Sequence, residues 1–347
     1  MTVQISKAHH YGILTLDKPK ALNALDIEMV TIIADTLKLW VNDKTIEAVI
    51  IRTDNPKSFC AGGDVKSVYY DIDAMRKGES EGDLFADFFF QEYCMNYLIS
   101  TFPKPIISLI DGICMGGGVG LSIHGSHRIV SDESVIAMPE TAIGLFPDVG
   151  VSHIFSKAPN HVGLFLGLTG YRMDACDSLY AGFATHIGSS DQIERFFHAI
   201  KRGEDYKDLL SDFSTEAQES TLKNHMSDIK DAMTPDTFEA LYNNLPQTSF
   251  GQQIKSDISA MSPLSMAVTF EHYYKAKSMS IEDILTMDYR LSQGCMVFGD
   301  FYEGIRALLI DKDKNPKWNP ASVELLEKEM VNKFFETEPK KGDLTFL

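Results

Sequence analysis

The sequence predicts an α/β fold in its first part and a mainly α-helical second part. Up to about residue 190, short β-branched runs alternate with segments whose apolar residues recur at helical spacing. This alternation is typical of sheets covered by helices. From residue 191 to residue 347 nearly all of the patterns are helical. We therefore expect a core over residues 1–190 and a helical C-terminal region over residues 191–347.

The N-terminal elements follow from their periodicity. Residues 3–16 alternate in a way that predicts a hairpin with its turn near His10. A helix is expected from about residue 27, where Asn23 or Asp26 can cap it. Residues 47–53 are rich in β-branched side chains and predict a buried strand.

The middle of the chain alternates between polar and apolar segments. Residues 71–83 are polar and contain glycine, which predicts an exposed, mobile loop. Residues 85–102 predict a helix with an aromatic stripe that packs in the core, and this helix contains Glu92. An apolar run at residues 106–110 predicts a strand that leads into three glycines, and residues 189–255 predict peripheral helices.

Composition excludes several classes of protein. The net charge of −17 over 347 residues argues against nucleic acid or an anionic membrane as a partner, although a few lysines can still bind a small anion. The five cysteines are odd in number and contain no Cys-x-x-Cys pair, which indicates reduced thiols and no zinc site. Without a leader-like N-terminus or a long apolar run, we expect a bacterial cytoplasmic protein, or a mitochondrial matrix protein if a transit peptide has been removed. The oligomeric state stays open, and a homo-oligomer is compatible with the sequence.

Common catalytic motifs do not occur. There is no phosphate-binding loop, no dinucleotide-binding glycine motif, no His-Glu-x-x-His and no nucleophile elbow. His124 and His127 have no acid or cysteine nearby at ligand spacing, so we expect no metal site.

Two glycine-rich turns and two acids remain as candidates for chemistry. The turns contain Gly63 and residues 116–118, and each follows a predicted strand. Such a turn exposes backbone N–H groups, and two that converge can stabilise an oxyanion. Either turn alone could be only a tight turn. Glu140 and Asp148 follow within apolar, glycine-rich sequence, where an unpaired carboxylate would be costly to bury. Together these features favour a site for a thioester or another acyl compound.

Several motifs in this order resemble the crotonase (enoyl-CoA hydratase/isomerase) superfamily. They are ALNALD, SFCAGGDV, GICMGGGVGLSIHGSHRIV, MPETAIG and LTGYRMDACDSLYAGFATHI. The resemblance implies a spiral of β-β-α units with a helical C-terminal part and an acyl-CoA substrate. It places the oxyanion donors at the N–H groups of Gly63 and Gly117, with Ala61 and the turn at residues 20–22 along the CoA. No cofactor is implied, because CoA is part of the substrate.

Departures from the hydratase pattern point to one branch of the superfamily. Hydratases carry glutamates at the positions of Gly120 and Glu140, and only the second is present here. Asp148 stands where hydratases have glycine. MPETAIGLFPDVG and the C-terminal half are similar to the branch that hydrolyses 3-hydroxyisobutyryl-CoA. In that branch Glu92, Gly117, Glu140 and Asp148 line the acyl site.

The resemblance leaves alternatives open. Glu140 would act as nucleophile or as general base, and Asp148 would hold the substrate 3-hydroxyl and pass a proton to the leaving thiolate. Glu92 would orient the substrate or Glu140, unless it is only a solvent-facing helix residue. The substrate would be 3-hydroxyisobutyryl-CoA, in valine degradation, or 3-hydroxypropionyl-CoA. The alternatives are an enoyl-CoA isomerase or hydratase on the same fold, and a non-catalytic acyl-CoA-binding subunit.

Overall fold

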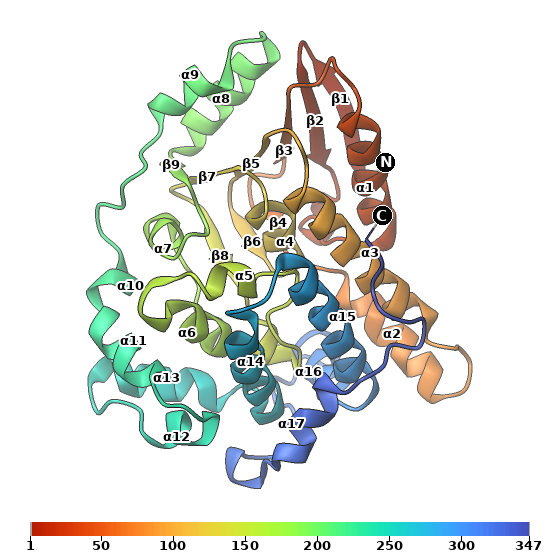
Figure 1. Cartoon of the computed structure of the whole chain (residues 1–347), viewed down its shortest axis with the longest axis vertical. Coiled ribbons are helices and arrows are strands. Elements are labelled where there is room, and N and C mark those ends of the chain that lie inside the picture. The colour runs from red at the N-terminus through yellow and green to blue at the C-terminus, as the bar shows by residue number, and fades with distance from the viewer. Residues whose placement is uncertain (1, 347) are drawn as a thin grey trace. The chain divides into compact units, whose positions relative to one another are not determined.

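The computed structural model describes residues 2–346 (Figure 1). These residues form two compact units, each assembled from three segments. Unit 1 comprises the residues up to Gly63, Cys94–Ala137 and Arg172–Lys223; unit 2 comprises Asp64–Tyr93, Met138–Tyr171 and the residues from Asn224 onward. The predicted division is a single cut in the sequence at residue 190, whereas each observed unit combines three separate segments. The two divisions cannot be compared directly, so the predicted one stays a prediction.

Unit 1 contains a six-stranded sheet in the order β1-β2-β3-β5-β7-β9. Its strands are β1 Val3–Ala8, β2 Tyr11–Leu16, β3 Ala48–Thr53, β5 Ile106–Ile110, β7 His127–Ser131 and β9 His186–Gly188. The first two strands pair antiparallel as the predicted hairpin, and the other neighbours pair parallel. The strand predicted at residues 47–53 is confirmed as β3.

A second, three-stranded parallel sheet in unit 1 explains the spiral. It contains β4 Ser58–Cys60, β6 Ile113–Met115 and β8 Val135–Ala137. Each of these strands follows directly on a strand of the large sheet, and a helical segment comes next: α2 Val65–Arg76, α4 Gly117–Ile123 or the 3-10 helix η2 Glu140–Ile143. Repeated strand pairs followed by a helical turn are the predicted β-β-α spiral, which is confirmed.

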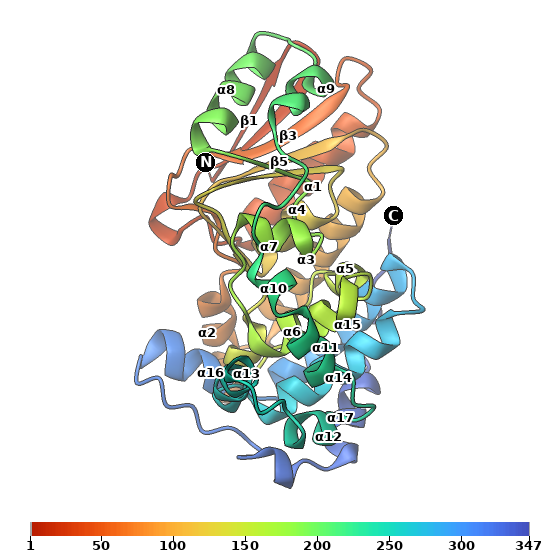
Figure 2. The same cartoon turned by 90° about the vertical axis from the view of Figure 1, so that its left-hand side faces the viewer.

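Helices cover both faces of the large sheet. α8 Ser190–Lys201 lies over one face of the sheet (Figure 2). Its Phe196 and Ile200 belong to the same buried cluster as Tyr11 and Ile13. On the other face lies α1 Ile27–Val41, and a Cβ atom on Gly12 would come within 2.5 Å of the Trp40 ring. Asp26 caps α1 by accepting a hydrogen bond from the Met29 N–H, which satisfies an orphan donor of the first turn. The other helices wholly within unit 1 are η1 Pro19–Ala21, α7 Ala175–Tyr180, α9 Tyr206–Leu209 and η4 Leu210–Asp212.

Unit 2 is largely helical. The helical character predicted for residues 191–347 is confirmed, because each regular element from Ser190 onward in the described chain is a helix. Besides α2 and η2, unit 2 contains α5 Ser152–Phe155, η3 Pro159–His161, α6 Val162–Thr169, α11 Met226–Met233, α12 Phe238–Asn243, α13 Ser249–Ser259, α14 Pro263–Ala276, α15 Ile281–Val297, α16 Phe301–Ile305, a π-helix Arg306–Ile310, η6 Val323–Leu325 and α17 Lys328–Phe335. α3 Asp83–Ser100 and α10 Thr221–Asn224 run from one unit into the other. Along residues 2–346, no helix combines the length and apolar character that crossing a membrane requires.

The loop predicted at residues 71–83 is wrong for most of its length. α2 continues to Arg76 and α3 begins at Asp83, so only residues 77–82 connect the two helices. Asp71 accepts hydrogen bonds from the Ser80 hydroxyl and the Phe85 N–H, and Ile72 is buried. The polar residues here stabilise a helix-to-helix turn, which composition alone does not distinguish from an exposed loop.

Candidate active site

The two predicted glycine turns lie side by side in unit 1. A Cβ atom on Gly62 would lie 3.3 Å from the carbonyl oxygen of Met115 and 3.9 Å from the amide nitrogen of Gly117. Gly117 is the first residue of α4, a position whose N–H has no acceptor within the helix. Within residues 2–346, neither Gly63 nor Gly117 donates its N–H to a backbone acceptor outside regular elements. Both N–H groups are therefore available for an oxyanion, and their role as donors stays a prediction.

Glycine is required where α4 approaches the small sheet. A Cβ atom on Gly118 would lie 2.3 Å from the carbonyl oxygen of Cys60, which is backbone and cannot rotate away. We expect Gly118→Ala to lower the free energy of unfolding by roughly 1–3 kcal/mol, as overpacking does. Thermal unfolding checks this expectation. Gly78→Ala is the control for a changed glycine, because its Cβ would meet open space, although its positive φ also disfavours alanine. An unfolding temperature for Gly118→Ala above that of Gly78→Ala would contradict the packing argument.

The segment predicted to lie along the CoA is fixed to the same turn. Ala61 donates its N–H to the Leu22 carbonyl at 3.0 Å. The buried Asn23 side chain donates to the Thr53 hydroxyl and to the Phe59 carbonyl, and so ties residues 18–23 to the strand before Ala61. The contact of Ala61 with CoA stays a prediction.

The three predicted acids belong to unit 2, where all of them are buried. Glu92 on α3 is 2% exposed, Glu140 at the start of η2 is 5% exposed, and Asp148 before α5 is 4% exposed. The alternative that Glu92 faces solvent is therefore wrong. Within residues 2–346, none of the three forms an ion pair with lysine, arginine or histidine, and Glu92 Oε1 and Glu140 Oε2 have no hydrogen-bond partner. Buried, unpaired carboxyl groups are costly to a fold, and such groups cluster at sites of chemistry.

Burial and mutual repulsion govern the protonation of these acids. Burial, together with the negative charge of Asp148, raises the pKa values of Glu92 and Glu140 well above their ordinary range. Burial also raises the pKa of Asp148 to about 7, against a hydrogen bond from Tyr93 that lowers it. Interacting acids titrate as a group, so the cluster retains protons at neutral pH that isolated acids would lose.

The backbone that carries Asp148 is strained. Val149 has a φ of 52° and is fully buried, although β-branched residues disfavour the left-handed region. Gly150 follows with a φ of 73°, and the Val151 N–H closes the turn onto the Asp148 carbonyl at 3.0 Å. The Tyr93 hydroxyl donates to Asp148 Oδ2 at 2.6 Å. Strain of this kind persists only where neighbours enforce it, and it is common at active sites.

Sequence patterns missed several residues around Asp148. Tyr93 belongs to the aromatic stripe of α3, and the sequence pattern gives no signal of what its hydroxyl contacts. His272 on α14 and Asp288 on α15 lie in segments predicted only as helices. Their partners in the Asp148 turn are more than 100 residues away in the chain, at separations of 120 and 138 residues.

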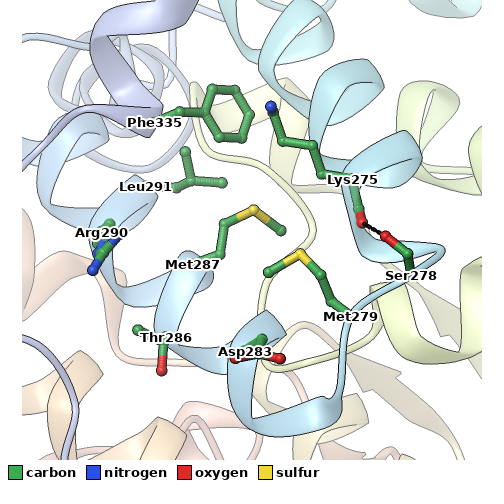
Figure 3. Close-up of a pocket in the computed structure, with 9 residues that line it drawn as sticks. All are labelled: Lys275, Ser278, Met279, Asp283, Thr286, Met287, Arg290, Leu291 and Phe335. Carbon is green, nitrogen blue, oxygen red and sulfur yellow. Dashed lines mark hydrogen bonds between the residues drawn. The ribbon is translucent and has the colours of Figure 1, made fainter.

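A cavity of about 530 Å³ lies elsewhere in unit 2 (Figure 3). Its lining residues are Lys275, Ser278, Met279, Asp283, Thr286, Met287, Arg290, Leu291 and Phe335, and none of them belongs to the predicted site. Within residues 2–346, no group of three or more histidine, cysteine or acidic side chains could hold a metal ion.

The chain has the crotonase fold, whose paired-strand spiral and glycine turns are described above. A family model described as enoyl-CoA hydratase/isomerase matches residues 11–335. The chain belongs to this enoyl-CoA hydratase/isomerase family.

Individual relatives cover nearly the whole chain. The mitochondrial 3-hydroxyisobutyryl-CoA hydrolase of Xenopus tropicalis is 43% identical over 95% of this chain and 88% of its own length, and the human enzyme is 38% identical over 96% and 88%. Two crystal structures are also similar. A carnitinyl-CoA dehydratase from Mycobacterium thermoresistibile has a TM-score of 0.93 at 34% identity, covering 99% of this chain and 98% of its own. An enoyl-CoA hydratase from Rhodobacter sphaeroides has a TM-score of 0.89 at 35% identity, with both chains fully covered.

Proposed function

We propose that this protein hydrolyses the thioester of a short 3-hydroxyacyl-CoA to the free acid and CoA. The observation that carries the proposal is the buried group of Glu92, Glu140 and Asp148, which has no cationic partner in the described chain. The preferred substrate is 3-hydroxyisobutyryl-CoA, which places the reaction in valine degradation, and 3-hydroxypropionyl-CoA is the second candidate. Relatives named as 3-hydroxyisobutyryl-CoA hydrolases, up to 43% identical, support this choice.

The proposed chemistry uses two backbone amides and three buried acids on one thioester. The N–H groups of Gly63 and Gly117 polarise the carbonyl. Glu140 either attacks the carbonyl carbon, giving a mixed anhydride that water opens, or takes a proton from an attacking water. Asp148 binds the 3-hydroxyl and gives a proton to the departing thiolate, while Glu92 orients the substrate or Glu140. In sum, water is added, the C–S bond breaks, and the acid and the CoA thiol are released.

A hydratase or dehydratase is the second candidate, because two similar crystal structures carry those names. Hydration of a double bond uses two carboxylates, and the position of the first is occupied here by Gly120, which has no side chain. This chain has a different second acid, because Asp148 stands at a position where hydratases have glycine. An isomerase needs only one acid, so Gly120 does not argue against it, and a 3-enoyl-CoA is included in the test below.

Thiol release from a panel of acyl-CoA esters tests the proposal. We expect rapid release from 3-hydroxyisobutyryl-CoA, at least tenfold slower release from isobutyryl-CoA, and none from crotonyl-CoA or a 3-enoyl-CoA. Asp148→Asn should reduce the preference for the 3-hydroxyl ester, because the loss of a good hydroxyl contact is usually worth 10-fold or more. Equal losses on both saturated esters would remove the hydroxyl-binding role of Asp148. Addition of water to crotonyl-CoA without thiol release would favour the hydratase, and binding without turnover would favour a non-catalytic subunit.

Three further expectations concern cofactors, cellular location and assembly. The reaction as written uses no metal and no cofactor besides the CoA of the substrate. The vertebrate relatives are named as mitochondrial. A bacterial cytoplasmic location and a homo-oligomer stay predictions.

A further inference from the structure

A closed chain of contacts surrounds the turn that follows Asp148. The Gly150 N–H donates to Asp288 Oδ2 at 2.7 Å. The other oxygen of Asp288, Oδ1, lies 2.7 Å from His272 Nε2, a close contact without the geometry of a hydrogen bond. His272 Nδ1 lies 2.9 Å from the Ser152 hydroxyl oxygen. Ser152 is two residues after Gly150, so the backbone closes the ring.

Every member of this ring is withdrawn from solvent. Ser152 and His272 are each 1% exposed, and Asp288 is 0% exposed. The Phe146 ring packs against the His272 ring at a centroid distance of 5.3 Å. Serine, histidine and aspartate have the composition of a hydrolytic triad, but a substrate cannot reach a hydroxyl that is buried in this way. The ring therefore needs a role other than nucleophilic attack.

The backbone enclosed by the ring indicates that role. Val149 holds a left-handed conformation that is strained for a β-branched residue, and it connects Asp148 to Gly150. If Asp288 did not hold the Gly150 N–H, that turn could relax and Asp148 would move. We propose that Ser152, His272 and Asp288 form a clamp that positions Asp148 for catalysis. The clamp rests on the function proposed above, and its members are positioning residues.

Asp288 also affects Asp148 through its charge. Tyr93 from α3 and Asp288 from α15 act on the pKa of Asp148. Asp148 in turn raises the pKa values of Glu92 from α3, Glu140 from η2 and Cys295 from α15. The negative charge of Asp288 contributes to the raised pKa of Asp148, after burial. Position and charge can therefore be separated: removing the Ser152 hydroxyl loosens the ring without changing any charge, whereas Asp288→Asn removes the charge and keeps the shape.

The test compares Ser152→Ala and Asp288→Asn in the full chain. Infrared difference spectra over a pH series follow the Asp148 carboxyl band, which Asp148→Asn assigns, and steady-state kinetics with 3-hydroxyisobutyryl-CoA give kcat and KM. The control is Asp177→Asn in unit 1, a buried aspartate that accepts hydrogen bonds from the Ser220 hydroxyl and the Leu222 N–H.

We expect Asp288→Asn to move the Asp148 titration midpoint to lower pH by roughly 1 unit, because a neighbouring negative charge is lost. Ser152→Ala should leave that midpoint in place and lower kcat about tenfold or more with little change in KM, because misplaced catalytic groups reduce kcat. Asp177→Asn should change neither quantity.

The clamp would be overturned by an Asp288→Asn midpoint equal to that of Asp177→Asn, or by wild-type kcat in Ser152→Ala. A loss of kcat in Ser152→Ala as large as the loss expected on removing a catalytic nucleophile would also overturn the clamp. Should Asp288→Asn not fold, Ser152→Ala decides alone. If the wild-type protein hydrolyses no ester of the panel, the proposed function fails, and the infrared titration still tests the link between Asp288 and Asp148.

Discussion

Replacing Glu140 with glutamine should lower kcat/KM for 3-hydroxyisobutyryl-CoA by about 10³-fold, or roughly 4 kcal/mol of transition-state stabilisation. The side chain keeps its size and can still accept a hydrogen bond, but it can neither attack a carbonyl nor take a proton from water. Glu140 Oε2 is buried and has no protein partner in the described chain, so little else depends on its charge. Thiol release under single-turnover conditions measures the effect on the chemical step.

Asp300→Asn is the matched control for Glu140→Gln, because Asp300 is a buried acid of the same unit with partners of its own. It accepts hydrogen bonds from the Ser262 hydroxyl and the Asn319 N–H. We expect kcat/KM within a few-fold of wild type for this variant once folding has been checked. A loss smaller than about tenfold in Glu140→Gln would mean that the assigned role is wrong. In that case Glu92, which is also buried without a partner for Oε1, becomes the first acid to test.

Local patterns were sufficient for much of the fold. Strands such as β3 and β5 are short apolar runs rich in β-branched residues, and this composition appears in any window of a few residues. Asp26 at the start of α1 is a capping residue that acts on its own helix. The loop prediction at residues 71–83 was wrong because the structure there depends on contacts between two helices and not on a local pattern. The contacts of Asp71 with Ser80 and Phe85 form only once two helices have been brought together.

The candidate site likewise contains residues that local sequence identifies and residues that it does not. Glu140 and Asp148 could be found because acids within apolar sequence are unusual, and the glycine turns because they follow strands. Tyr93 could not be found, because a tyrosine in an aromatic stripe has the same pattern whether or not its hydroxyl contacts Asp148. The His272–Asp288 pair needs α14 and α15 to bring distant residues to the Asp148 turn. No short window of sequence carries that information.

Asp148→Asn should stabilise the protein at neutral and alkaline pH while it weakens catalysis. The pKa of Asp148 is about 7 in the folded chain, compared with 3.8 for an unperturbed aspartate. Between these two values the folded state binds the proton that the unfolded state has released, so the free energy of unfolding falls as pH rises. Above pH 7 the full loss, a few kcal/mol, is present. Asparagine cannot ionise and avoids this loss, while its oxygen can still accept the Tyr93 hydroxyl.

Urea unfolding of wild type and Asp148→Asn at pH 5, 6.5 and 8 measures the effect, because other titrating groups largely cancel in the difference. The advantage of the variant should grow with pH up to about 7 and then level off. A difference that does not depend on pH would mean that the pKa of Asp148 is not raised by burial. A growing difference together with reduced turnover would mean that one buried carboxyl both destabilises the fold and serves the reaction. Such a trade-off is expected where an acid is kept away from water in order to donate a proton near neutral pH.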